Sequence, residues 1–258
     1  MFDFSGKSVI VTGGSKGVGF GISAAFLAAG ADVFICGRSA PESLPHANGK
    51  AAVFHSVDVR QPDATQQLID AVLQQSGRLD VLINNAGGSP PVAAADASPR
   101  LTESIIRLNL IAPMILAQQA YHAMRKTGGS IINIASISGE RPSPGTAAYG
   151  AAKAGLINAT RSLAQEWGAD QVRVNAIIAG MIKTEASHDH YGGQAGIRLI
   201  EESLPMKRMA VPDDIAHACL FLADDHAAYI SGAALEVYGA GEPPSFLKLA
   251  QDAFSLGE

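Results

Sequence analysis

The sequence predicts an α/β fold, in which helices cover both faces of a doubly wound parallel sheet of about seven strands. Short apolar runs of strand length alternate with helical patterns along the chain, which is typical of parallel βαβ units. A glycine-rich turn separates the first of these strands from the first helix. We find no internal repeat, heptad run or linker in the 258 residues, so we expect a single domain spanning residues 1–258.

Composition argues against several classes of protein. The hydrophobic content of 47% and the 27 glycines indicate a large core with several tight turns, and the net charge of -5 without a basic run argues against a nucleic-acid partner. No window approaches the roughly 20 consecutive apolar residues that span a membrane, and residues 1–7 lack the form of a signal peptide. Cys36 and Cys219 form no CxxC pattern, so we expect two buried, reduced thiols and a cytoplasmic location.

The chain begins with the pattern of one βαβ unit. Residues 7–12 and 31–36 are apolar runs of strand length, and residues 17–30 show helical spacing. The turn before the helix carries Gly13, Gly17 and Gly19, a spacing that differs from the G-x-G-x-x-G dinucleotide fingerprint. Glycines still permit a sharp turn and close backbone approach, and a helix N-terminus offers N–H groups to a pyrophosphate. We predict nucleotide binding here, with an ordinary glycine-rich turn as the alternative.

Basic residues stand where a dinucleotide's adenosine ribose is usually bound. The second strand is followed by Arg38 rather than by an acid, and Lys16 lies in the glycine turn. An acid at this position favours NAD, whereas an arginine accommodates a 2′-phosphate. The pair predicts NADP(H) over NAD(H), unless both side chains are solvated surface charges.

Two further strands are expected at residues 51–57 and 79–84, with a helix at 62–76 that Gly77 ends. Asp58 follows the first of them, and an Asn/Gly turn at 84–88 follows the second, at the edge where open α/β sheets bind ligands. Asp58 could accept a hydrogen bond from an adenine amino group, or it could be an acid at the N-terminus of the next helix.

The pattern from residue 99 to residue 126 predicts one long helix with Asn109 and Pro113 inside it. A proline cannot donate a hydrogen bond to the carbonyl four residues earlier. We therefore predict a kink that leaves the carbonyl of Asn109 available to hold a water. The alternative is a kink that matters only for packing.

A candidate proton-transfer site follows in the middle of the chain. An apolar strand at 131–136 ends at Ser136, and an Ala-rich helix from about 146 to 168 carries Tyr149 and Lys153 one turn apart on one face. A nearby cation favours phenolate and moves the pKa of a tyrosine from about 10 towards neutral, which makes it a usable acid or base. Alone, the Tyr-x-x-x-Lys spacing is weak evidence, because any exposed helix can carry it.

The last third of the chain completes the sheet. We expect strands at 172–178 and 234–238, helices at 197–204 and 212–223, and a short helix at 244–254 within the tail 243–258. Residues 183–205, polar and glycine-rich from 185 to 196, suggest a mobile lid over the substrate. His188 and His190 in this segment are interpreted as solvated or substrate-facing, and no metal site is expected.

Together these motifs resemble the short-chain dehydrogenase/reductase family over nearly the whole chain. In order, they are Thr12-Gly-Gly-Ser-Lys-Gly-Val-Gly19, Asn84-Asn-Ala-Gly87, Asn109, Ser136, Tyr149-x-x-x-Lys153 and Asn175-x-Ile-x-x-Gly180-x-Ile-x-Thr184. Lys16 with Arg38 resembles the NADP(H)-preferring members, such as the 3-oxoacyl-[acyl-carrier-protein] reductase-like and tropinone reductase-like proteins.

The resemblance implies a Rossmann-like fold and hydride transfer between a nicotinamide and a ketone or secondary alcohol. It makes Tyr149 the catalytic acid/base, with Lys153 lowering its pKa and holding the nicotinamide ribose. It also implies that Ser136 binds the substrate oxygen and that Asn109 supports a water in the proton relay. The implied cofactor contacts are Gly13, Ser15, Lys16, Gly17, Val18, Gly19, Arg38, Asp58, Val59, Asn85, Ala86, Gly87, Tyr149, Lys153, Ile182 and Thr184.

Two departures from the family pattern stand out. Ala179-Gly180 replaces the usual Pro-Gly, which could loosen the lid hinge, and residues 237–241 read Val-Tyr-Gly-Ala-Gly where the family usually has Val-Asp-Gly-Gly. The second change affects packing near the usual subunit contact. The family commonly forms homotetramers or dimers through its long helices, and the Ala-rich helices here permit the same arrangement.

Other functions stay open at this point. The leading prediction is an NADPH-dependent carbonyl or 3-oxoacyl-type reductase, whose small-molecule substrate would be chosen by residues 89–98, 138–146 and 182–205. The alternatives are an NAD(H)-dependent secondary-alcohol dehydrogenase and a nucleotide-sensing protein without catalysis. The three-residue gap between Tyr149 and Lys153 disfavours enoyl reduction, because enoyl-reducing relatives generally space the two residues more widely.

Overall fold

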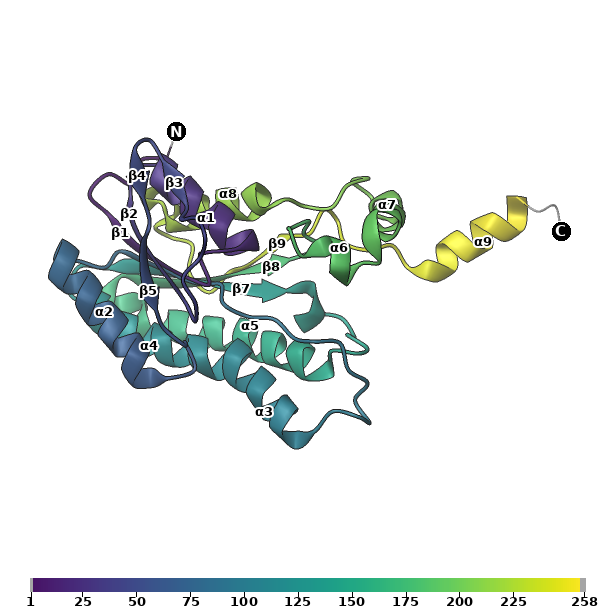
Figure 1. Ribbon diagram of the computed structural model, residues 1–258, viewed down its shortest axis with the longest axis horizontal. Coiled ribbons are helices and arrows are strands. Elements are labelled where there is room, and N and C mark those ends of the chain that lie inside the picture. The colour runs from purple at the N-terminus through teal and green to yellow at the C-terminus, as the bar shows by residue number, and fades with distance from the viewer. Residues whose placement is uncertain (1, 256–258) are drawn as a thin grey trace.

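The computed structural model describes residues 2–255, so residue 1 and residues 256–258 of the expected domain and tail lie outside the described residues. Its centre is a seven-stranded parallel sheet in the order β5-β2-β1-β6-β7-β8-β9 (Figure 1). The strands are β1 Ser8–Thr12, β2 Asp32–Gly37, β5 Val53–Ser56, β6 Val81–Asn84, β7 Gly129–Ser136, β8 Val172–Ala179 and β9 Ala234–Val237. The expected Rossmann-like sheet is confirmed.

Helices cover both faces of this sheet. Figure 1 shows α1 and α8 on one face and α2, α4 and α5 on the other. The α-helices are α1 Gly17–Ala28, α2 Pro62–Ser76, α3 Pro99–Ile106, α4 Ala112–Met124, α5 Ala147–Trp167, α6 Ser187–His190, α7 Gly193–Ser203, α8 Pro212–Ala223 and α9 Ser245–Ser255. A π-helical segment spans Arg107–Ile111, and short 3₁₀ turns occupy Ile137–Gly139, Gly168–Asp170 and Asp225–Ala227.

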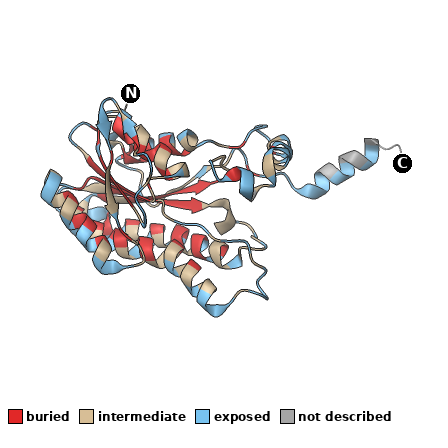
Figure 2. Ribbon diagram, viewed as in Figure 1, coloured by how far each residue is buried: buried red, intermediate tan, exposed pale blue. Residues whose placement is uncertain are grey.

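The core lies between the sheet and these two helical layers, as the buried residues in Figure 2 show. Along β1, Val9 and Val11 pack with Phe26 of α1 in one cluster, whereas Ile10 packs with Leu116 of α4 in the other. Successive side chains of a strand point to opposite faces, so both faces of a covered parallel strand must be apolar. The buried strand at residues 8–12, apolar from Val9 to Val11, is therefore typical of a central strand.

The chain order of the strands positions the functional site. From β1 the chain passes to β2 and β5 on one side and then returns to β6 on the other side of β1. Open α/β sheets bind ligands beyond the carboxyl ends of the strands at such a reversal. Thr12 links the ends of β1 and β6 at this reversal. Its Oγ1 donates to Ile83 O over 3.3 Å and accepts from the N–H groups of Asn85 and Ala86, each at 2.9 Å.

A small hairpin, which the sequence interpretation missed, precedes β5. Strands β3 His46–Ala47 and β4 Lys50–Ala51 pair antiparallel around Asn48 and Gly49, both with positive φ. An Asn-Gly pair is a strong signal for a tight hairpin turn, and it was the clue available in the sequence. Because residues 50–51 belong to this hairpin, the strand expected at 51–57 begins only at Val53.

The prediction of one continuous helix over residues 99–126 is wrong, because the helix is interrupted in the middle. The stretch consists of α3, a π-helical turn and α4, and the N–H of Ala112 donates to Arg107 O five residues earlier. Pro113 stands in the first turn of α4 and has no N–H to donate to the carbonyl of Asn109. The break predicted from Pro113 thus takes the form of a widened turn around Asn109, a type of turn that is frequent at functional sites.

The segments after β8 extend from the sheet. The expected lid, residues 183–205, contains α6 and α7, so much of it is helical; its movement stays a prediction. Helix α9 projects away from the body, and Phe246, Leu249 and Phe254 on it are exposed (Figures 1 and 2). Both cysteines are buried and unpaired by disulfide, as expected. Across the described residues, none of the helices has the length and apolar character needed to cross a membrane.

Candidate active site

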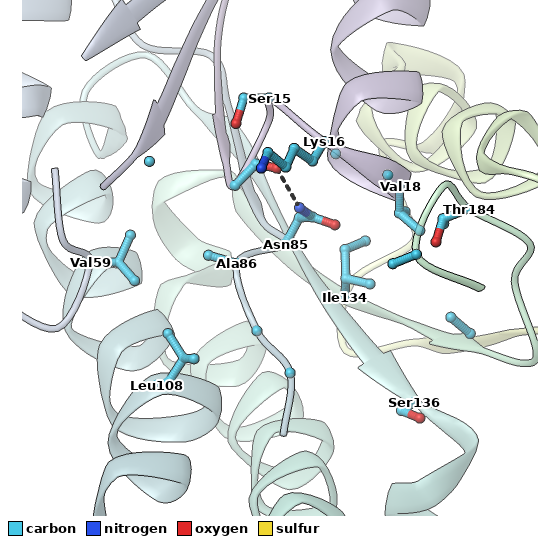
Figure 3. Close-up of a pocket in the computed structure, with 18 of the residues that line it drawn as sticks. Ser15, Lys16, Val18, Val59, Asn85, Ala86, Leu108, Ile134, Ser136 and Thr184 are labelled. Carbon is cyan, nitrogen blue, oxygen red and sulfur yellow. Dashed lines mark hydrogen bonds between the residues drawn. The ribbon is translucent and has the colours of Figure 1, made fainter. Parts of the chain in front are cut away.

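One cavity of about 750 Å³ opens across the carboxyl ends of the strands and brings most of the predicted site residues together. Figure 3 shows Ser15 and Lys16 on one side of it and Ser136 on the other. The predicted residues that line it are Gly13, Ser15, Lys16, Gly17, Val18, Gly19, Arg38, Asp58, Val59, Asn85, Ala86, Gly87, Ser136, Tyr149, Lys153, Ile182 and Thr184. Asn109 lies behind the cavity wall, fully buried.

The glycine turn between β1 and α1 forms a tight backbone cradle. Gly13 and Gly17 have φ values of 64° and 50°, which a glycine adopts without strain. A Cβ at Gly19 would stand 2.3 Å from Gly13 O, so no larger residue fits there. The amide of Asn85 reaches across from β6 and donates to Gly13 O over 3.3 Å (Figure 3). The local sequence therefore builds a sharp turn whose backbone faces the cavity.

The N-terminus of α1 has a contact that the sequence interpretation missed. The N–H of Gly17, the first residue of α1, donates to Oε1 of Glu185 over 2.9 Å. Glu185 lies at the start of the expected lid and lines the cavity. A helix N-terminus attracts negative charge, so this carboxylate occupies a natural anion position. Because 168 residues separate the two partners, no local pattern could have revealed the pair.

Charged side chains gather around the glycine turn and the ends of β2 and β5. Lys16 and Arg38 are exposed at the cavity, and Asp58 forms an ion pair of 2.6 Å with Arg60, a lining residue that the sequence interpretation did not select. The hydrogen bonds from Arg60 hold the pKa of Asp58 below its usual value, and Arg38 adds to that effect. The alternative of Asp58 as a helix N-terminal acid is not what the structure shows, because Gln61 is the N-cap of α2.

Ser136 and Tyr149 meet at the far end of the cavity. Ser136 is the last residue of β7, its Oγ accepts from the N–H of Ser138 over 3.2 Å, and both Ser136 and Tyr149 of α5 line the cavity. Burial raises the pKa of Tyr149 above its ordinary value, Ser136 opposes that rise, and Tyr191 adds to it. The expected lowering of this pKa is therefore not seen here, because desolvation outweighs the opposing effect of Ser136.

Lys153 is buried behind Tyr149. Only 4% of Lys153 is exposed, its Nζ donates to Ile134 O over 2.7 Å, and the same atom lies 5.5 Å from the centroid of the Tyr149 ring. Burial lowers the pKa of Lys153 to about 8. The ammonium is thus close to the phenol, as the helical spacing predicted, but it is directed to a backbone carbonyl of β7.

Asn109 fixes the chain at Gly87 and Gly88 from behind. Its Oδ1 accepts from the N–H of Gly88 and its Nδ2 donates to Gly88 O, each over 2.9 Å, and Nδ2 also donates to Ile105 O. A Cβ at Gly87 would stand 2.7 Å from that Oδ1 and 3.3 Å from Nζ of Lys153. The side chain of Asn109 therefore holds the turn after β6 close to Lys153; a water at its carbonyl stays a prediction.

The segment after β8 closes the last side of the cavity. The N–H of Thr184 donates to Oγ of Ser187 over 2.8 Å, which in turn donates to Ile182 O over 3.3 Å. Tyr191, which the sequence interpretation did not select, also lines the cavity. At the hinge, a Cβ on Gly180 would stand 2.6 Å from Cβ of Tyr238, so the glycine that follows the departure at Ala179 packs directly against the departure at Tyr238.

Comparison with known proteins places this geometry in a family. The family model described as Enoyl-(Acyl carrier protein) reductase matches residues 13–239. The 3-oxoacyl-[acyl-carrier-protein] reductase FabG of Chlamydia trachomatis is 36% identical over 90% of this chain and 96% of that protein. The D-threitol dehydrogenase of Mycolicibacterium smegmatis is 35% identical, over 92% of this chain and 94% of that one.

A solved structure agrees with these relatives. The crystal structure of a putative short-chain alcohol dehydrogenase from Sinorhizobium meliloti superposes with a TM-score of 0.84 at 34% identity, covering 92% of this chain and 97% of the other. The parallel sheet, the cavity at the carboxyl ends of its strands and the match over most of the chain all agree with one assignment. The protein belongs to the short-chain dehydrogenase/reductase family of oxidoreductases.

Proposed function

We propose that the protein is an NADPH-dependent reductase of a ketone or 3-oxoacyl-type substrate, working by hydride transfer between the nicotinamide and the carbonyl carbon. The observation that carries the proposal is one continuous cavity, which joins the glycine turn at one end to Ser136, Tyr149 and Lys153 at the other. A site that only sensed a nucleotide would have no need of these three groups together.

The residues present fit a nicotinamide dinucleotide. Gly13, Gly19 and Gly87 form a cradle that a Cβ would fill, and the α1 N-terminus already holds a carboxylate where a pyrophosphate would lie. Lys16 and Arg38 are exposed beside it and would bind a 2′-phosphate. The rest of the cofactor groove would be formed by Ser15, Gly17, Val18, Asp58, Val59, Asn85, Ala86, Ile182 and Thr184. When bound, the cofactor supplies the hydride.

The protein's part in the chemistry is the handling of a proton. Because the pKa of Tyr149 is raised, its phenol is protonated at neutral pH and can donate to a carbonyl oxygen as that oxygen gains charge. Ser136, which lines the same end of the cavity as Tyr149, would bind the same substrate oxygen. Lys153, with its pKa near 8, is mostly charged at neutral pH and would hold the nicotinamide ribose.

Asn109 acts behind these groups in the proposal. Its side chain positions the turn at Gly88 beside Lys153. Its backbone carbonyl receives no hydrogen bond from Pro113, because proline has no N–H, and would instead hold a water of the proton relay. We further propose a cytoplasmic homo-oligomer, a dimer or tetramer, without nucleic-acid or membrane partners.

The second candidate is an NAD(H)-dependent secondary-alcohol dehydrogenase. It is favoured by the relatives named as dehydrogenases, including a probable galactose dehydrogenase of Rhizobium meliloti that is 34% identical over 92% of this chain and 95% of that protein. The basic pair Lys16 and Arg38 argues against it, because an acid rather than an arginine usually binds the unphosphorylated ribose.

Calorimetric titration of the purified protein with NADPH and with NADH tests the proposal. We expect NADPH to bind at least about tenfold more tightly, since the 2′-phosphate would form charge-assisted hydrogen bonds with Arg38 and Lys16. A preference for NADH would move the assignment to the alcohol dehydrogenase. Binding of neither dinucleotide would refute the reductase altogether.

A further inference from the structure

The carboxylate of Glu185 occupies the anion position of the cavity. Its Oε1 accepts a hydrogen bond of 2.9 Å from the N–H of Gly17, where α1 begins. Glu185 comes from the segment after β8. The first turn of α1 has no acidic residue of its own. The contact therefore joins the expected lid to the part of the cavity that the proposed function assigns to the pyrophosphate.

Two anions cannot share this position. A helix N-terminus offers a small number of N–H donors and a partial positive charge, and a carboxylate bound there repels a second negative group at close range. A pyrophosphate that approaches Gly17 must therefore displace Glu185 before it can bind the same N–H. We propose that Glu185 is an internal competitor of the dinucleotide, which sets cofactor affinity and ties the lid to α1 until the cofactor binds. This inference rests on the proposed function.

The displacement reaches the substrate side of the cavity. Glu185 follows Thr184 directly, and Ser187 connects the N–H of Thr184 to Ile182 O through hydrogen bonds of 2.8 and 3.3 Å. Thr184, Glu185 and Tyr191 all line the cavity, and Tyr191 raises the pKa of Tyr149. Release of Glu185 from Gly17 thus moves a hydrogen-bonded segment whose other end faces the proton donor. Cofactor binding and the shape of the substrate site are coupled through this one contact.

Four proteins test the competition: the wild type, Glu185→Ala, Glu185→Gln and the matched control Asp189→Asn. Asp189 lies in the same segment, and its exposed side chain carries the same charge. Calorimetric titration with NADPH and, separately, with inorganic pyrophosphate measures affinity without reference to activity. We expect Glu185→Ala to bind both about tenfold more tightly, since it loses a hydrogen bond to a charged acceptor. Glu185→Gln should tighten both ligands by a smaller factor, and the control should equal the wild type.

Hydrogen exchange at the Gly17 amide gives a second readout. In the wild type without ligand this amide should be protected, and Glu185→Ala should remove that protection while Asp189→Asn keeps it. Equal or weaker binding of both ligands by Glu185→Ala would overturn the inference, as would an equal gain in the control. If none of the four proteins binds NADPH, the proposed function fails instead, and the pyrophosphate titration still decides whether Glu185 competes for the helix N-terminus.

Discussion

The two ends of the cavity differ in how their charged groups are exposed to water. At the glycine-turn end, Lys16 and Arg38 are exposed, and the nearby pair of Asp58 and Arg60 is only partly buried. At the other end, Lys153 is almost completely buried and its Nζ bonds a backbone carbonyl. The pKa of Asp58 follows its charged partner, whereas the pKa of Lys153 follows desolvation. Proximity of opposite charge governs the first end, and burial governs the second.

This contrast sets the expected size of mutational effects. Exposed charges are screened by water and salt, so each contributes modestly and mainly to the choice of ligand. A buried ionisable group has no such screening, and its protonation state is coupled to the stability of the fold and to the chemistry beside it. Substitutions at the proton-transfer end should therefore have larger effects than substitutions at the phosphate end.

The largest effect is expected for Tyr149→Phe. Loss of the proton donor should reduce turnover by about 10³-fold, the scale of general acid catalysis, while the affinity for NADPH stays within a few fold. Steady-state kinetics on a carbonyl substrate, together with NADPH titration, measure both quantities. Tyr121→Phe is a suitable control, because Tyr121 bonds Asp170 away from the cavity. Near-normal turnover in Tyr149→Phe would remove Tyr149 from the chemistry.

A pH-dependent stability difference is expected for Lys153→Met. In the folded wild type Lys153 titrates at about pH 8 rather than at its ordinary 10.5, so between these values the unfolded chain holds a proton that the folded chain lacks. Stability of the wild type should therefore rise with pH across this window, by on the order of 3 kcal/mol relative to the variant. Urea denaturation at pH 7 and pH 10 measures the change.

The exposed Lys126 gives the control for this prediction. The difference in free energy of unfolding between Lys126→Met and the wild type should stay the same from pH 7 to pH 10. A flat difference for Lys153→Met as well would mean that burial does not depress the pKa of Lys153. The contrast between the two ends of the cavity would then lose its main support.

The smallest effects are expected at the phosphate end. Arg38→Asp should weaken NADPH roughly tenfold to a hundredfold more than NADH, because it removes a charge-assisted contact to the 2′-phosphate. Arg60→Ala should change the ratio of the two affinities by less than about threefold, since Arg60 is already engaged by Asp58. Parallel titrations with both dinucleotides decide the point. Equal losses of NADPH and NADH in Arg38→Asp would contradict the assignment of Arg38.

Much of the fold followed from local patterns. Helix α2 matches the predicted bounds of 62–76, and Gly77 ends it in a left-handed conformation as expected. The π-helical turn was not predicted, because the apolar spacing on its two sides was interpreted as one continuous helix. The hairpin at Asn48 was missed although the Asn-Gly signal was present.

The candidate site divides in the same way. Ser136, Tyr149 and Asn85 were found because each lies at a strand end or on a helix face that the sequence marks, and parallel strands bring their carboxyl ends to one edge. Arg60 was two residues from Asp58 and could have been selected as its partner. Tyr191 had no signal beyond its place in a polar segment.

The sequence by itself determined the order of the main strands and helices, the glycine turn and most of the predicted groups that meet at the cavity. Continuous apolar runs, glycines and helical spacing are local properties, and the right-handed parallel topology then leaves few ways to arrange them. Only the tertiary structure decided the charge states and the occupant of the α1 N-terminus. The depth of Lys153 and the contact of Glu185 with Gly17 depend on segments far apart in the chain, and desolvation and charge act through space rather than along the sequence.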